Sequence, residues 1–167
     1  VPAMLSYVAA MIILEERDAG LVSYLVVTPL GKRGYLLSRF GFTGLISLLY
    51  SAALYALFHL AEFSPPLLAA SALAGTVQGV GSAMLIVLCS KNKVEGMAVG
   101  ELTSLFTLAA LAPFLLKGNI QYLFSILPSF GLAKTAAQEN PLFLAAAGLV
   151  ALLWVILPVQ WFTRKLF

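Results

Sequence analysis

Charged side chains are scarce in this sequence. Ten basic and seven acidic residues make up 10% of its 167 residues, whereas about 25% of an average soluble domain is charged. These polar groups are too few to cover the surface of a soluble protein of this size. Their scarcity excludes an ordinary soluble domain, a disordered chain and a nucleic-acid-binding module. The 61% of hydrophobic residues and the mean hydropathy of +0.98 instead indicate an integral membrane protein.

Cysteine and histidine are nearly absent, because the chain has one of each, Cys89 and His59. A single cysteine forms no disulfide within the chain, and no Cys/His spacing typical of a metal site is present. One histidine also leaves no Ser/His/Asp or Cys/His arrangement for nucleophilic catalysis. The phosphate-binding pattern Gly-x-x-x-x-Gly-Lys-Ser/Thr is missing as well. We therefore expect a chain that is not an enzyme and that binds neither a metal nor a cofactor.

Long apolar runs dominate the sequence that remains. A transmembrane helix needs about 20 largely apolar residues, and runs of this length predict complete membrane helices at residues 35–61, 66–90, 96–116 and 142–162. Residues 1–14 are apolar but too few to cross, and we interpret them as the end of a membrane helix that begins upstream. Residues 117–141 space their apolar side chains as an amphipathic or re-entrant segment does. The sequence thus predicts one all-α, polytopic membrane domain over residues 1–167.

The basic residues are distributed unevenly between the two sides of these predicted helices. Lysine and arginine concentrate on the cytoplasmic side of membrane proteins, and eight of the ten here fall on one side. These are Arg17, Lys32, Arg33, Arg39, Lys91, Lys93, Arg164 and Lys165. We therefore expect residues 15–34 and the C-terminus to face the cytoplasm of a cell membrane, and residues 117–141 to lie outside.

The predicted cytoplasmic segment at residues 15–34 is charged at its ends and amphipathic in between. After Glu16-Arg17-Asp18 comes the run Leu21–Val27, which is too short to cross a membrane. Thr28-Pro29 predicts a helix start, because threonine caps helices and proline suits the first helical position. A short surface helix of this kind either docks a partner or merely anchors a turn at the interface, and both interpretations stay open at this point.

This segment resembles the signature of ABC-2 type permeases, the membrane subunits of one class of ATP-driven exporters. The matching residues are Glu16-Arg17-Asp18-Ala19-Gly20, Val27-Thr28-Pro29-Leu30, Lys32-Arg33 and Arg39. The spacing is kept without a gap. The sequence departs from the family at Asp18, where glutamate is usual, at Leu21, where threonine is usual, and at Ser23, where glutamate is common. The linker at residues 117–141 also matches the excursion between the fifth and sixth helices of that family.

The resemblance implies a permease half that pairs with a second permease half and with cytoplasmic ABC ATPase subunits, which carry ATP and Mg. In such exporters a coupling helix sits on the ATPase and carries its motion to the membrane helices. By this resemblance, the docking residues are Gly20, Leu21, Tyr24, Leu25, Val26, Thr28, Pro29 and Leu30. Glu16, Arg17 and Asp18 would form a polar hinge next to them.

Mapped onto a six-helix permease of this type, residues 1–14 are the end of the second helix, so the sequence is expected to be incomplete at its N-terminus. The short loops look like those of a small prokaryotic drug exporter, such as a fluoroquinolone-export type. Two other functions stay open from the residues alone. One is a membrane scaffold or assembly protein that binds a cytoplasmic partner, and the other is a proton-coupled secondary transporter.

Three residues inside the predicted helices stand out. Glu101 is an ionisable group in an apolar run, which marks it for gating or a polar pathway, although it could instead pair with Lys91 or Lys93 near the interface. Gly75-x-x-x-Gly79 provides a face of small residues, which lets two helices approach closely. We expect the two glycines to serve helix packing. Lipid is the remaining expected partner, and no nucleic acid is expected.

Overall fold

The computed structural model describes residues 2–29, 31–58, 65–116, 118–138 and 140–165. All regular structure in these ranges is helical, which confirms the all-α expectation for them. In chain order the elements are α1 (Pro2–Asp18), α2 (Leu21–Val27), α3 (Gly31–Leu36), the π-helix η1 (Leu37–Gly41), α4 (Phe42–Phe58), α5 (Pro65–Cys89), α6 (Lys93–Leu105), the 3₁₀-helix η2 (Phe106–Leu111), α7 (Ala112–Leu115), the 3₁₀-helix η3 (Asn119–Ile126), α8 (Pro128–Gln138) and α9 (Pro141–Lys165).

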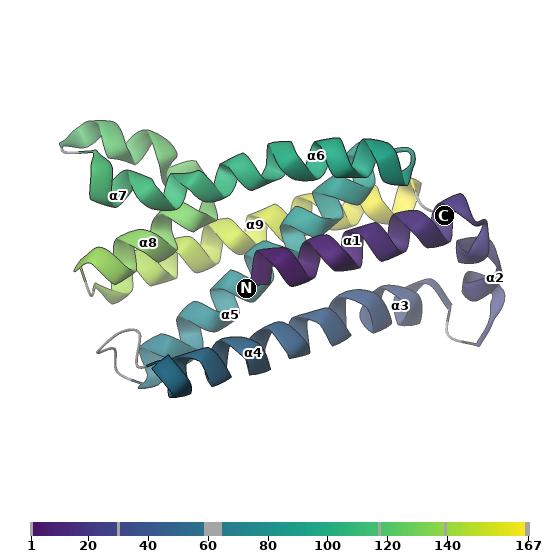
Figure 1. Ribbon diagram of the computed structural model, residues 1–167, viewed down its shortest axis with the longest axis horizontal. Coiled ribbons are helices and arrows are strands. Elements are labelled where there is room, and N and C mark those ends of the chain that lie inside the picture. The colour runs from purple at the N-terminus through teal and green to yellow at the C-terminus, as the bar shows by residue number, and fades with distance from the viewer. Residues whose placement is uncertain (1, 30, 59–64, 117, 139, 166–167) are drawn as a thin grey trace.

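The long helices run side by side along one axis (Figure 1). The helix α5 lies among them and contacts α1, α4, α6, α8 and α9. One end of the bundle holds the short helix α2, the turn between α5 and α6 and the last part of α9 (Figure 1). The helices α7 and α8 lie at the opposite end. The segments predicted to be cytoplasmic therefore share one end of the molecule, and the linker predicted to lie outside is at the other.

The best-buried packing lies between α1 and α5. Ala10, Ile13 and Leu14 of α1 have no exposed surface, and they form one cluster with Ala83 and Val87 of α5, which are also fully buried. These positions recur at spacings of three and four residues, so each set occupies one face of its helix. The helix α1 is thus a packed member of the bundle and continues as one helix from the apolar run into the charged residues up to Asp18.

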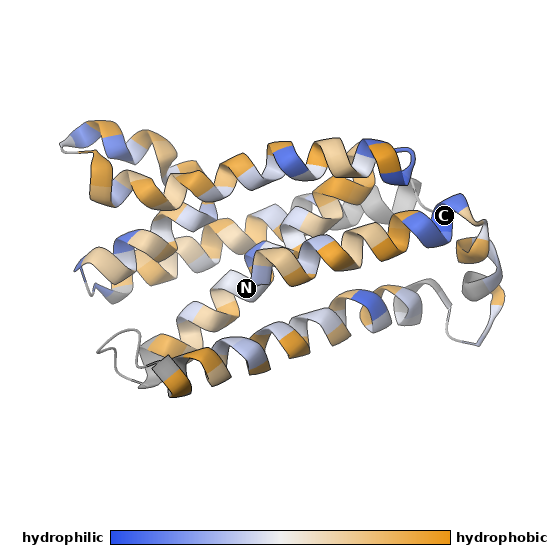
Figure 2. Cartoon of the chain, viewed as in Figure 1, coloured by the Kyte–Doolittle hydropathy of each residue, from blue (hydrophilic) through white to orange (hydrophobic). Residues whose placement is uncertain are grey.

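Among the described residues, three helical stretches are long and apolar enough to cross a membrane: Gly34–Leu54, Leu68–Cys89 and Lys93–Leu115. In α9, where several side chains after Ile156 lie outside the described part of the structure, the apolar stretch found among the described residues is Leu142–Ile156. Apolar residues cover the lengths of these helices, and hydrophilic residues gather mainly toward their ends (Figure 2). The described residues therefore support a membrane protein with three candidate spans, and the expected number of four complete spans stays a prediction.

Glycines bring neighbouring helices into close contact. A Cβ atom placed on Gly79 would lie 2.5 Å from the Ser6 hydroxyl oxygen and 3.0 Å from the Pro2 carbonyl oxygen, so α5 meets α1 here through backbone. Gly75 is less crowded, because its nearest neighbour is a Pro2 side-chain atom at 3.7 Å. The sequence analysis did not single out a second pair of this kind, Gly96 and Gly100, which brings α6 against α1.

We expect Gly79→Ala to destabilise the protein, because the added methyl group overlaps Ser6 and the Pro2 backbone. Overpacking of this kind costs about 1–3 kcal/mol, and thermal unfolding in detergent would show it as a lower Tm. Gly148→Ala is the matched control, since nothing lies within 4 Å of a Cβ atom at that helical position. Equal Tm values for the two variants would contradict close packing at Gly79.

At the opposite end of the molecule, a buried lysine joins three elements. Lys134 of α8 is only 3% exposed, and its Nζ donates a hydrogen bond to Gln121 Oε1 of η3 at 2.7 Å. The ammonium also lies 5.1 Å from the ring centroid of Tyr122 and 5.7 Å from that of Phe143, which lies in the first turn of α9. Lys134, which lies in the linker predicted at residues 117–141, thus holds η3 against α8 and α9.

Candidate functional site

The carboxylate of Glu16, in the last turn of α1, bonds to the start of the next long helical stretch. It forms an ion pair with Arg39, whose Nε also donates to Glu16 Oε2 at 3.1 Å. The hydroxyl of Tyr35, whose residue is 1% exposed, donates to the same oxygen at 2.8 Å. Since α2 lies between Glu16 and Tyr35 in the chain, these bonds tie together the two segments that enter and leave α2.

The neighbouring residue, Arg17, points to a different helix. Its guanidinium donates to the carbonyl oxygens of Val87, at 3.3 Å, and Ser90, at the C-terminal end of α5. The last carbonyls of a helix have no partner within the helix and carry partial negative charge, so a cation placed there is favourable. Arg17 therefore caps α5 and fixes the end of α1 to it.

Glu15 and Asp18, the residues on either side of Glu16 and Arg17, bind the start of α6. The Asp18 carboxylate accepts a hydrogen bond from the Lys93 backbone N–H at 2.8 Å, and Lys93 Nζ forms a 2.7 Å ion pair with Glu15. A carboxylate at a helix N-terminus is stabilised by the unpaired N–H groups and the helix dipole. The Lys93–Glu15 pair is well exposed, and such pairs contribute little stability, about 0–1 kcal/mol.

These contacts form one cluster, which we call the charged clamp. It joins the end of α1 to η1, to the end of α5 and to the start of α6. The clamp consists of Glu15, Glu16, Arg17 and Asp18 with Tyr35, Arg39, Ser90 and Lys93. The structure thus brings together all three residues predicted as a polar hinge, and it adds partners that the sequence analysis did not assign to them.

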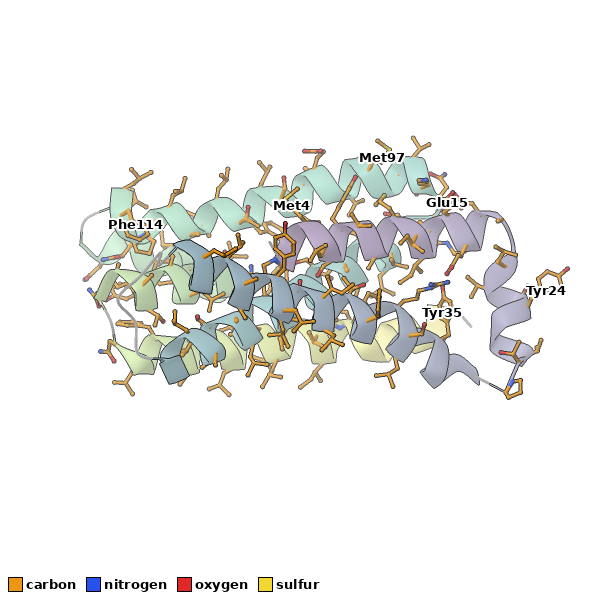
Figure 3. The ribbon with its side chains drawn as sticks, turned by 60° about the horizontal axis from the view of Figure 1, so that its bottom comes forward. Met4, Glu15, Tyr24, Tyr35, Met97 and Phe114 are labelled. Atoms are coloured by element: carbon orange, nitrogen blue, oxygen red, sulfur yellow. The ribbon has the colours of Figure 1, made fainter. Side chains whose placement is uncertain are left out.

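The short helix α2 lies across the end of the bundle next to the clamp and exposes apolar side chains. Leu21, Tyr24 and Val27 are 48%, 71% and 82% exposed, and Tyr24 points away from the bundle (Figure 3). Val22 faces inward and is 6% exposed. The spacing of the three exposed residues places them along one side of the helix. We call these three residues the α2 patch.

Two glycines with left-handed backbone flank α2. Gly20, with φ 71°, precedes it, and Gly31, with φ 60°, begins α3. The predicted helix start at Thr28-Pro29 is wrong: Thr28 caps the C-terminal end of α2, and the next helix begins at Gly31. The Gly31 N–H donates to the Thr28 carbonyl at 3.0 Å and closes a turn, and this turn separates α2 from the next helix. Thr28 and Pro29 are exposed, as is Gly20.

The other predicted docking residues are only partly described. Leu25 and Val26 lie in α2, but their side chains are outside the described part of the structure, as is the whole of Leu30.

Glu101 lies on α6, exposed, and lines a cavity between α1, α5 and α6. The alternative that it pairs with Lys93 is wrong, because the Lys93 ammonium contacts Glu15 instead. Among the described residues, no ion pair or side-chain hydrogen bond joins Glu101 to Lys91 either. Glu101 is therefore separate from the charged clamp, although both involve α6.

A search of known protein families matches residues 1–160 to the family described as fluoroquinolones export permease protein Rv2686c-like. The chain belongs to this family. Searches of curated proteins and of solved structures found no match.

Membership in the Rv2686c-like family agrees with the apolar helices and makes the chain an export-permease-like membrane protein. It also agrees with the drug-export resemblance drawn from the sequence. The family description does not mention ATP, an ATPase or a coupling helix, so these belong to the proposal that follows.

The sequence contained a usable signal for part of the clamp. Its positive-inside count placed Lys93 and Arg39 on the same side of the membrane as residues 15–34. That count gives no pairing, however. Tyr35 and Ser90 gave no signal, because one is an aromatic residue near the start of a predicted span and the other a small residue at the end of one.

Proposed function

We propose that this chain is the membrane subunit of an ATP-driven exporter of the cell membrane. It would pair with a second permease half within the lipid bilayer and bind a separate ABC ATPase through α2. The observation that carries this proposal is the α2 patch. Apolar residues on the solvent-exposed end of a bundle, outside the candidate spans, are typical of a surface that binds another protein.

The charged clamp supports a coupling role for α2 beyond simple docking. Because Glu16 binds Tyr35 and Arg39, a force on α2 acts on α1 and on the helix that continues into α4. Arg17 and Asp18 extend the same connection to α5 and α6. A partner that moves α2 would therefore move several long helices together. A helix that only anchors a turn would not need such connections.

The substrate proposed for the first test is a fluoroquinolone, since the family description names these compounds. In this proposal the chain has no catalytic residues of its own, and ATP and Mg are bound by the partner. The C-terminus lies at the same end of the molecule as α2 (Figure 1), and the proposal places that end in the cytoplasm.

A photo-crosslinking amino acid at position 24 tests the docking surface directly. Tyr24 is 71% exposed on α2, and Tyr50, 56% exposed on α4, provides a control on the side of the bundle. Crosslinking in the native cell membrane should join position 24, and not position 50, to an ABC ATPase. Crosslinks from position 24 to a protein without ATPase activity would favour the scaffold alternative.

A further inference from the structure

A cavity of about 460 Å³ lies between α1, α5 and α6. This volume falls within the roughly 300–1,000 Å³ of small-molecule sites. Gly100 and Tyr7 both line this cavity and meet closely, because a Cβ atom on the glycine would lie 2.3 Å from the tyrosine ring. Met4 and Val8 of α1 and Ile86 of α5 contribute apolar side chains to the lining.

The hydroxyl oxygens of the lining residues can accept hydrogen bonds from a ligand in the cavity. Each donates its proton to a carbonyl oxygen of its own helical stretch, at 2.6–3.0 Å, which leaves the oxygen lone pairs for a ligand. These bonds are Ser82 to Gln78, Thr103 to Val99, Ser104 to Glu101 and Thr107 to Ser104. No lysine, arginine or histidine is among the residues described as lining the cavity. An anion would therefore find few partners here.

Glu101 gives the lining its negative charge. It lies in the candidate span Lys93–Leu115, eight residues and therefore about 12 Å along the helix from Lys93. No ion pair among the described residues neutralises it. An ionised carboxylate at such a depth is costly unless it faces water or a positive partner, so the cavity is electrostatically suited to a cation.

We propose that this cavity binds an amphiphilic organic cation, with its positive charge at Glu101 and its apolar body against Met4, Val8 and Ile86. The inference rests on the proposed export function, because it assigns a substrate class to the permease. It concerns binding to this chain alone, however, and needs no ATPase. Its outcome is therefore separate from that of the ATPase proposal.

Binding of tetraphenylphosphonium to the purified, full-length protein in lipid nanodiscs tests the site. This probe is apolar and carries a charge that does not titrate. Glu101→Gln should weaken its binding about tenfold, which corresponds to the loss of one favourable charge interaction. Binding of triphenylphosphine oxide, which is neutral and has a similar apolar body, should be unchanged in the same variant.

Two further variants define the outcomes. Glu95→Gln neutralises a carboxylate on the same helix outside the cavity and should leave binding of both probes unchanged. Val8→Trp fills the cavity at a half-exposed position without altering a charge, and it should weaken binding of both probes. The inference is overturned if the wild-type protein shows no saturable binding of the cation. It is equally overturned if either Glu101→Gln or Val8→Trp, folded as judged by Tm, binds the cation as tightly as wild type.

Discussion

Replacing Tyr24 and Val27 together with aspartate will abolish ATPase binding and leave the fold intact. The two side chains are 71% and 82% exposed, so their removal costs the isolated chain little packing. In the proposed complex they become buried, and a buried apolar anchor contributes about 2 kcal/mol or more, roughly 30-fold in affinity for each residue. Co-purification of the ATPase with the permease, together with the Tm of the permease alone, measures both effects.

Two controls make this result specific to the α2 patch. Tyr24→Phe keeps the apolar ring and should keep the ATPase bound. Val94→Asp changes an apolar side chain that is 78% exposed near the start of α6, at the same end of the molecule but outside α2, and should also leave binding intact. If Val94→Asp and the double variant release the ATPase equally, binding depends on the general charge of this end and not on α2.

Glu16→Gln will separate ATP hydrolysis from transport while the ATPase stays bound. The carboxylate side chain is 13% exposed, and the neutral amide loses the ion pair with Arg39 and leaves the buried Tyr35 hydroxyl with a weaker acceptor. Arg39 is partly exposed, so the loss of stability is modest, about 1–2 kcal/mol. The connection between α1 and η1 then loosens, and the number of substrate molecules exported per ATP should fall by roughly tenfold.

The charge-reversed pair Glu16→Arg with Arg39→Glu tests whether the link itself matters. It should recover part of the coupling that each single reversal removes, as a double-mutant cycle would show. Glu95→Gln again serves as a control, because that carboxylate accepts a hydrogen bond from the Lys91 backbone N–H and lies outside the clamp. An unchanged ratio of transport to hydrolysis in Glu16→Gln would mean that the clamp is a static support.

The helices were predictable because a single apolar segment in a membrane can pair all its backbone groups only as a helix. Every backbone polar group must be paired within the segment, which favours helices over the whole run. The predicted spans 66–90 and 96–116 lie close to α5 and to the stretch from α6 to α7. Hydropathy gave no sign of the π-helix at Leu37–Gly41 or of the 3₁₀ stretch at Phe106–Leu111, since these depend on local packing.

The candidate site was predictable only in part. The motif and its amphipathic run located α2 and the residues Glu16, Arg17 and Asp18. Their bonding partners depend on how the ends of α1 and α5 meet the start of α6, and a single sequence carries no record of that arrangement. The same limit applies to Lys134, whose burial against Tyr122 and Phe143 contradicts the usual expectation for a lysine in a linker.

The helix start at Thr28-Pro29 failed for a local reason. Threonine and proline were taken as the cap and first residue of a helix, but proline also follows helix ends commonly. The left-handed Gly31 and the turn from Thr28 show that the break ends α2 before α3 begins. This short break gives α2 its own direction relative to the bundle, as the proposed docking role needs.

Transport in inverted membrane vesicles tests whether ATP hydrolysis drives export through this chain. Vesicles that contain the chain and its ATPase are supplied with ATP, and accumulation of a fluoroquinolone is followed with and without an uncoupler that collapses the proton gradient. ATP-driven export predicts accumulation that requires ATP, persists with the uncoupler and disappears in the Tyr24→Asp/Val27→Asp variant. Accumulation that follows an imposed proton gradient without ATP would contradict it and would make the chain a secondary transporter.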